Sequence, residues 1–122
     1  MKKLIFVFGI TIVSFASFAQ TVVTETNGRV TVRNANDSII AQIADIGSGA
    51  IAASFNDNKT EIDVVYANGD VLIKKPDGTT IVQIAEANDD KAVSATYSGD
   101  NVIVTTQSGQ TLTKNALEWR PQ

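Results

Sequence analysis

One unit of the sequence occurs twice, and this repeat constrains the fold more than any other feature. Residues 27–45 read NGRVTVRNANDSIIAQIAD, and residues 68–86, at a constant offset of 41, read NGDVLIKKPDGTTIVQIAE. The identical pairs are Asn27/Asn68, Gly28/Gly69, Val30/Val71, Ile40/Ile81, Gln42/Gln83, Ile43/Ile84 and Ala44/Ala85. A fixed period of this size is typical of a repeated supersecondary unit. The pattern also extends outward, because residues 91–97 resemble residues 50–55 at an offset of 42.

Short β-branched runs alternate with polar turns along the whole repeat region. Asn27-Gly28 and Asn68-Gly69 each join two such runs, which indicates a hairpin because both residue types tolerate positive φ. The sequence predicts an all-β fold: an antiparallel meander of about ten short strands built from a blade-like repeat, as an incomplete propeller, a sandwich or an open roll. The strands are expected at residues 21–26, 29–33, 38–44, 50–55, 61–66, 71–75, 79–85, 91–97, 101–106 and 111–113.

Residues 38–44 are also compatible with a helix. Ile39, Ile40, Ile43 and Ile46 have helical spacing, and a glycine follows them. The second copy of the unit decides for a strand, because its counterpart begins after Pro76-Asp77-Gly78, a tight-turn signal.

The first residues are typical of a targeting segment. Lys2 and Lys3 precede an apolar run from Leu4 to Phe15, and small residues flank Phe18 just before Gln20. This pattern predicts a secretory signal peptide over residues 1–19 and a single domain over residues 20–122. We therefore expect a periplasmic or secreted protein without a transmembrane segment after signal cleavage.

The composition excludes several kinds of site. The chain has no His and no Cys, so it lacks the commonest general base, the usual zinc ligands and the thiol nucleophile. Its formal net charge is −3 and it has no basic run, which argues against binding nucleic acid. We expect no enzyme activity and no cofactor.

Four strands per period, a first strand that ends in an aromatic residue and an x-Gly turn together resemble a β-propeller blade of the WD40 or YVTN type. Residues 51–55, 62–66, 68–71, 76–78 and 81–84 carry this resemblance, which covers about residues 21–113. It implies a fold of radially arranged blades. A closed propeller needs at least four blades, and this chain holds fewer, so the resemblance implies either assembly of several chains or an open arrangement.

A shorter stretch, residues 98–119, resembles the periplasmic LptC-like and OstA-like domains of lipopolysaccharide transport. The matching positions are Asn101, Val102, Val104, Gly109, Leu112, Thr113, Leu117 and Trp119. This resemblance implies a stack of short strands whose apolar interior carries a lipid chain.

The aromatic residues after the signal peptide are the first candidates for a binding surface. Phe55, Tyr66, Tyr97 and Trp119 could form a stacking platform or a peptide groove. Phe55 and Tyr97 occupy equivalent repeat positions, which favours packing between sheets instead. Trp119 stands outside the repeat and is expected either at an open end of the sheet or in a contact between chains.

Gln42 and Gln83 are further candidates, because both recur inside apolar strands. They could line a shared groove, or each could satisfy a backbone group at an edge or a bulge. The second interpretation is favoured.

Residues 56–61, continued by Asp63, bring oxygen ligands into one loop, as a calcium site would. They lack the spacing and the glycine of an EF-hand, and Lys59 lies among them. We therefore expect a solvated hairpin turn there, and another polar turn at residues 88–90.

The function expected from these features is an exported, non-catalytic interaction module that uses a sheet face or a strand edge. Its partner is expected to be a protein or another extended ligand, including a second copy of the chain. The alternative is a periplasmic lipid carrier or scaffold of the LptC-like or OstA-like kind.

Overall fold

The fold consists of β-strands in the part of the chain that the structure describes. The structure is a computed structural model that describes residues 20–115. The prediction of an all-β antiparallel meander is confirmed, with ten strands and no helix within this range. The strands are β1 (Thr21–Thr24), β2 (Val30–Arg33), β3 (Ile39–Ala44), β4 (Ala50–Phe55), β5 (Ile62–Tyr66), β6 (Val71–Lys74), β7 (Thr80–Ala85), β8 (Ala92–Ser98), β9 (Asn101–Thr106) and β10 (Thr111–Asn115).

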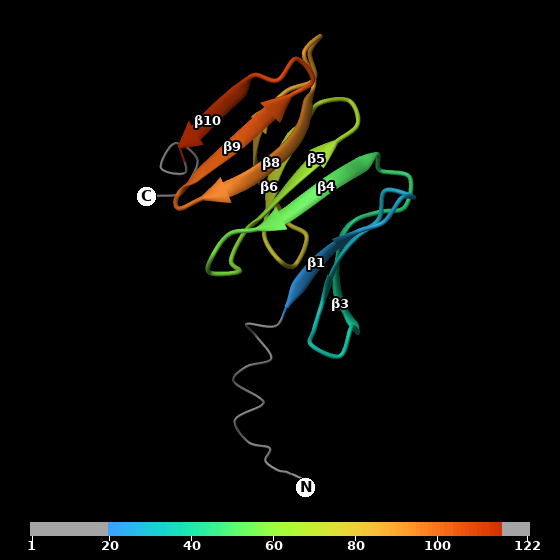
Figure 1. The fold of residues 1–122 in the computed structure, drawn as a ribbon. Coiled ribbons are helices and arrows are strands. Elements are labelled where there is room, and N and C mark those ends of the chain that lie inside the picture. Colours follow the sequence, from blue (N-terminus) through green and yellow to red (C-terminus); the bar gives the residue numbers. More distant parts are fainter. Residues whose placement is uncertain (1–19, 116–122) are drawn as a thin grey trace, which may run out of the picture.

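These strands form three sheets, each of which is a simple meander. The first sheet has the order β1-β2-β3, the central sheet β4-β5-β6-β7, and the third sheet β8-β9-β10. All neighbouring strands are antiparallel. Figure 1 shows the sheets following one another through the molecule, and the described strands do not close into a barrel. The predicted signal peptide and Trp119 lie outside the described residues.

The Asn-Gly turns differ in one detail from the expectation. Gly28 and Gly69 have φ angles of 92° and 99°, whereas the asparagine before each glycine has a negative φ. The Gly69 N–H donates to the Tyr66 carbonyl at 2.9 Å, and the Tyr66 N–H donates to the Asp70 carbonyl at 2.9 Å. This geometry is a type I turn that ends in a left-handed glycine. The asparagine stabilises the turn through its side chain, since Asn68 Oδ1 accepts the Asp70 N–H at 2.9 Å.

The repeated unit has the same strand pairing in the first and the central sheet. Thr31 pairs with Gln42 in one, and Leu72 pairs with Gln83 in the other, in each case between two β-bulges at equivalent positions. A bulge adds one residue to one strand and increases the local twist. Equivalent residues of β2 and β6, and of β3 and β7, therefore have the same position in the strand pairing.

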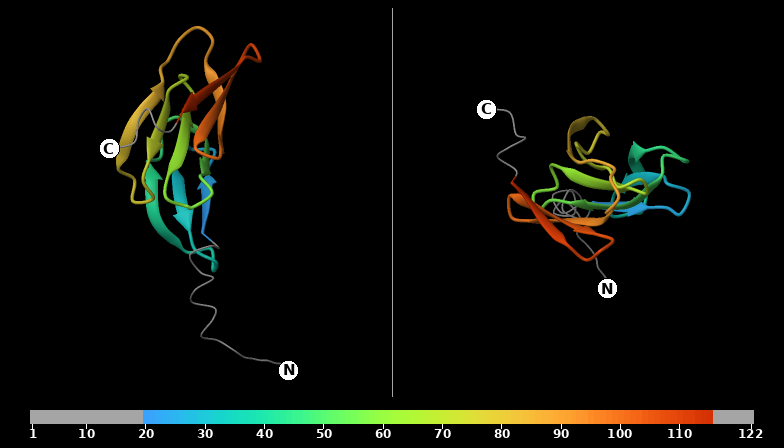
Figure 2. Two further views of the ribbon diagram at one scale, coloured as in Figure 1. Left: turned by 90° about the vertical axis from the view of Figure 1, so that its left-hand side faces the viewer. Right: turned by 90° about the horizontal axis from the view of Figure 1, so that it is seen from above.

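The central sheet is covered on both faces, and each covered face holds a core. Val30, Val32 and Ile43 of the first sheet pack against Ile62 and Val64 of β5. The opposite face has the second core, made with the third sheet: Val65, Val71, Ile73, Ala92, Ala95, Val102 and Val104. The layered arrangement is visible in the two turned views (Figure 2).

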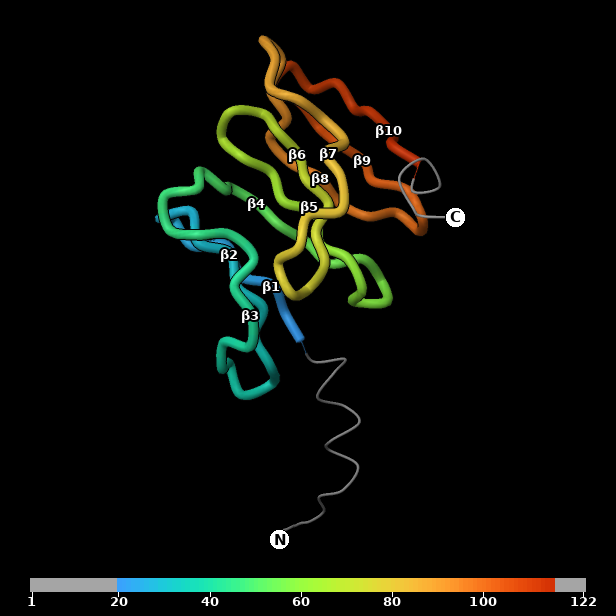
Figure 3. Tube along the Cα trace, turned by 180° about the vertical axis from the view of Figure 1, so that it is seen from behind, coloured from blue at the N-terminus to red at the C-terminus, as the bar shows by residue number. Residues whose placement is uncertain are grey.

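Close backbone contacts fix the first sheet against the central one. Gly78, in the turn between β6 and β7, leaves no room for a side chain, because an added Cβ would lie 2.9 Å from the Gln42 carbonyl oxygen. Lys74 Nζ donates to the Ile43 carbonyl at 2.9 Å. The view from behind shows this turn of the central sheet near β3 (Figure 3).

Candidate functional site

The predicted aromatic residues lie in two different cores and do not share one surface. Phe55 and Tyr66 are half-buried against the first core, and Tyr97 is half-buried against the second. Phe55 also lies under Lys59, whose Nζ is 5.2 Å from the ring centroid. Trp119 lies outside the described residues. The three described rings therefore contribute to packing between sheets.

Gln42 and Gln83 are exposed and lie on the outer strands β3 and β7. Gln83 Nε2 donates to the Ala85 carbonyl at 3.2 Å and to Asp70 Oδ1 at 3.3 Å. Gln42 Nε2 donates to Asp45 Oδ1. Each amide thus bonds to groups close to a bulge, and the two lie in different sheets.

The loop of the possible calcium site folds as a turn that uses its own oxygens. Asn56 Oδ1 accepts the N–H groups of Thr60 and Glu61 at 2.8 and 3.0 Å. Asp63 does not join this loop, because it lies inside the molecule. The acidic turn before β8 is similar: Asp90 accepts hydrogen bonds from Ser108 and Thr106, which lower its pKa. Within residues 20–115 no group of three or more acidic, His or Cys side chains could hold a metal ion.

Asp63 is the unexpected polar group of the structure, because it is fully buried between the central and third sheets. It accepts the Ser54 N–H at 3.2 Å and the Ser54 hydroxyl at 2.9 Å. Burial raises the pKa of Asp63 from 3.8 to about 7, and the two hydrogen bonds from Ser54 limit the rise. The sequence does carry a signal: Asp63 stands in a run of otherwise apolar residues typical of a strand covered on both faces.

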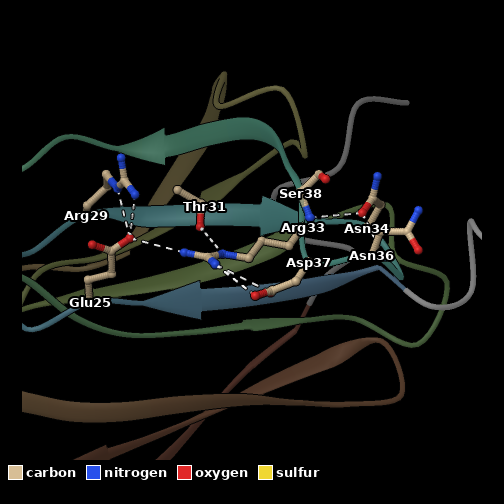
Figure 4. A network of polar contacts seen from close by, with 8 residues as sticks. All are labelled: Glu25, Arg29, Thr31, Arg33, Asn34, Asn36, Asp37 and Ser38. Atoms are coloured by element: carbon tan, nitrogen blue, oxygen red, sulfur yellow. Dashed lines mark hydrogen bonds and ion pairs between the residues drawn. The ribbon is translucent and has the colours of Figure 1, made fainter.

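The outer face of the first sheet is covered by its own charged side chains (Figure 4). Glu25 accepts Arg29 Nε and Nη2, both at 2.9 Å, and lies 3.4 Å from Arg33 Nη2. The Arg33 guanidinium also reaches Thr31 Oγ1 at 3.3 Å and both carboxylate oxygens of Asp37 at 3.4 Å. Thr31 beneath it has no exposed surface. These side chains form hydrogen bonds and ion pairs with one another, and together they cover the outer face of the first sheet.

The outer face of the third sheet is rich in hydroxyl-bearing residues. Val102 and Val104 of β9 face the second core, so the side chains between them and their partners on β10 face outward. The strand pairing assigns Thr105 beside Thr111 and Ile103 beside Thr113 to that side. The equivalent pairs in the central sheet are Val65 with Val71 and Asp63 with Ile73, all buried. Thr105, Thr111 and Thr113 stand where the central sheet has the buried residues Val65, Val71 and Ile73. Threonine suits a strand face in contact with water.

Two clefts open at the ends of the sheets. One, of about 550 Å³, lies between the turns of the central sheet and is lined by Lys59, Lys75, Asp77 and Ile81 among others. Another, of about 250 Å³, lies beside Ile51 at the start of β4. Both are open to solvent. Among the described residues there is also no helix with the length and hydrophobicity needed to cross a membrane.

The outer edges of the three sheets differ from one another. β3 and β7 each carry two bulges along their pairing with the neighbouring strand. β10 pairs with β9 over five residues without a bulge. It is also exposed, and Leu112, its second residue, keeps 41% of its surface accessible. β10 is thus a straight, accessible edge.

Comparison of the chain with protein-family models and with curated proteins finds no match in either case.

Proposed function

We propose that the protein is an exported, non-catalytic interaction module that binds an extended polypeptide along the open edge of β10. The observation that carries this proposal is a difference between the sheets. The strands equivalent to β10 are β2 and β6, and each of them pairs with a further strand, β3 or β7. No described strand pairs with the corresponding side of β10.

The edge presents backbone groups that can pair. The Thr106 N–H donates to the Gln110 carbonyl at 2.9 Å, so this is a hydrogen-bonded pair. Hydrogen-bonded and non-hydrogen-bonded pairs alternate along an antiparallel ladder. Leu112 and Lys114 therefore bond to β9, whereas the N–H and C=O groups of Thr111 and Thr113 point away from it. An added antiparallel strand would receive these groups, which is the geometry of β-strand addition.

The sheet faces offer less to a partner than this edge does. The outer face of the first sheet is occupied by the paired side chains of Glu25, Arg29 and Arg33, and the outer face of the third sheet is rich in threonine. Most large apolar side chains lie in the two cores. The exposed ones do not belong to one sheet but are spread over β3, the turn after it, β4, β8 and β10: Ile39, Ile40, Ile46, Ile51, Val93 and Leu112. Polar outer faces are also what terminal units of a stacked repeat need for solubility.

The lipid-carrier alternative has no supporting observation among residues 20–115. Ile62, Val64, Val65 and Ile73 fill the space between the sheets with zero exposure. A site for an acyl chain would need that space to be empty. The strand-binding function is therefore the one we propose.

A peptide titration followed by NMR tests the proposal. The probe is a synthetic peptide with the sequence of residues 79–86, TTIVQIAE, which spans β7. The control is the same peptide with proline in place of its valine, which corresponds to Val82, the partner of Ile73 in the central sheet. We expect the probe to perturb the amide signals of Thr111 and Thr113 and the control to leave them unchanged. Perturbation confined to other strands, or no perturbation up to the solubility limit of the peptide, would refute edge binding at β10.

A further inference from the structure

We infer that the partner of the β10 edge is a second copy of this chain, paired β10 to β10 in antiparallel fashion about a two-fold axis at Thr113. This inference rests on the proposed function, because it names the occupant of the same edge. Pairing of this kind would join two third sheets into one continuous sheet with the order β8-β9-β10-β10-β9-β8.

The alternation of backbone groups requires a register that places Thr111 and Thr113 opposite outward-facing residues of the second copy. Full overlap of the two five-residue strands selects one of the registers that meet this requirement. With Thr113 opposite Thr113 of the second copy, the two residues exchange both of their outward N–H and C=O groups. In this register Thr111 lies opposite Asn115, the residue that ends the strand. A shift by one position would place the groups already bonded to β9 at the new ladder, so it gives no hydrogen bonds. The isologous arrangement is the one typical of two-fold dimers.

The side chains of this register are compatible with one another. Thr113 meets Thr113 on the hydroxyl-rich face, and threonine pairs are favourable across strands. On the other face Leu112 lies opposite Lys114, so the aliphatic part of the lysine side chain can cover the exposed leucine. No like charges lie directly opposite each other. The strand is self-complementary as it stands.

The other edges are built in ways that discourage the same pairing. β-bulges interrupt β3, β7, β4 and β8, and bulges are a common device against edge-to-edge association. β1 has no bulge, but it lies beside β4 of the central sheet. β10 therefore combines an unbroken ladder with an exposed strand.

The contact is small, so we expect a dimer that dissociates on dilution. A single strand edge buries less surface than the interfaces of permanent dimers. A weak dimer is compatible with the proposed function, because a polypeptide partner can then displace the second copy from the β10 edge.

Disulfide trapping tests the register directly, because the chain contains no cysteine. Residues in a hydrogen-bonded antiparallel pair have Cα atoms about 5.5 Å apart, within the range of roughly 4.4–6.8 Å that a disulfide spans. Thr113→Cys should give a covalent dimer under mild oxidation. Gln42→Cys, on the bulged edge of β3, is the matched control and should remain monomeric.

Sedimentation equilibrium of the unmodified protein and two variants provides the second arm. Thr113→Pro removes the outward N–H and leaves the hydrogen bonds between β9 and β10 intact, as proline on an edge strand can. Thr113→Val retains the N–H and the side-chain shape. We expect the unmodified protein and Thr113→Val to dimerise, and Thr113→Pro to dimerise at least tenfold more weakly with an unchanged far-UV spectrum.

The outcomes separate this inference from the function on which it rests. Monomers at all concentrations, together with no covalent dimer from Thr113→Cys, would overturn self-pairing even if the TTIVQIAE peptide binds at β10. A dimer that Thr113→Pro does not weaken, or that Gln42→Cys traps equally well, would assign the contact to another surface. The proposed function is tested separately by the peptide titration, and absence of peptide binding at β10 would refute it.

Discussion

The hydroxyl oxygen of Ser54 lies 2.9 Å from Asp63 Oδ2, in the layer between the central and third sheets. The same oxygen lies 3.3 Å from the Ala95 carbonyl of β8. A serine hydroxyl has one proton, so it cannot donate to both acceptors at once. When Asp63 is protonated, its own O–H can donate to Ser54, and the Ser54 proton is then available to Ala95. The protonation state of Asp63 thus governs a hydrogen bond that joins two sheets.

The stability of the protein should fall as pH rises from about 4 to about 7. Burial raises the pKa of Asp63 from 3.8 to about 7, so the folded state retains a proton that the unfolded chain has already released in this interval. A group of this kind stabilises the fold fully below its unfolded pKa and loses that contribution as pH approaches its folded pKa. We expect a loss on the order of 2–4 kcal/mol from this residue. Urea unfolding at several pH values measures it.

Asp63→Asn provides the control for this pH dependence. The amide has the shape of the protonated acid but does not titrate, so its variant should lose most of the slope between about pH 4 and 7. At about pH 8 it should be more stable than the unmodified protein. An equal slope in both proteins would mean that other groups cause the effect.

Ser54→Ala should weaken the contact between the central and third sheets. The substitution removes the hydroxyl that lies between Asp63 and Ala95 but leaves the backbone N–H of residue 54, which donates to Asp63 at 3.2 Å. We expect a cost of about 1–2 kcal/mol. Because the hydroxyl lowers the pKa of Asp63, its loss should raise that pKa further. Carboxyl-carbon NMR titration checks the pKa, and an unchanged or lower value would contradict the assignment.

The strands themselves could be predicted because their signals are local. Alternation and turn residues indicated a strand over residues 79–85, and the structure has β7 over Thr80–Ala85. The expected strand over residues 21–26 ends at Thr24 instead, and the turn that follows is closed by the hydrogen bond from the Gly28 N–H to the Glu25 carbonyl. Ends of strands depend on such individual bonds, and the periodic pattern does not contain them.

The packing of the sheets could not be derived in the same way. Whether Asp63 faces water or another sheet depends on β8, which lies about thirty residues further along the chain. The outward groups of Thr113 likewise become visible only once the pairing of β10 is known. Alternation tells which residues share a face, but it does not tell which face is covered.

Gly78→Ala should destabilise the contact between the first and central sheets. Gly78 has φ of 95°, and a Cβ there would lie 2.9 Å from the Gln42 carbonyl oxygen. Gly109 has a similar φ of 94°, but a Cβ there would meet no atom within 4 Å, so Gly109→Ala isolates the backbone strain. We expect about 1 kcal/mol for Gly109→Ala and roughly 2–4 kcal/mol for Gly78→Ala. Equal losses in thermal unfolding would show that the close contact has no cost of its own.

Arg33→Ala should cost more stability than Arg29→Ala, although both arginines contact Glu25. Arg33 also covers the buried Thr31 and reaches Asp37, so its removal exposes the sheet face. Arg29 forms a partly exposed pair of the kind that contributes little in water. We expect about 1–2 kcal/mol for Arg33→Ala and less than about 0.5 kcal/mol for Arg29→Ala. Urea unfolding at low and high salt separates the two contributions, because screening weakens the charge pairs but leaves the covering of Thr31 unchanged. If high salt abolished the whole difference between the variants, Arg33 would act through charge alone and its role as a cover of the sheet would be wrong.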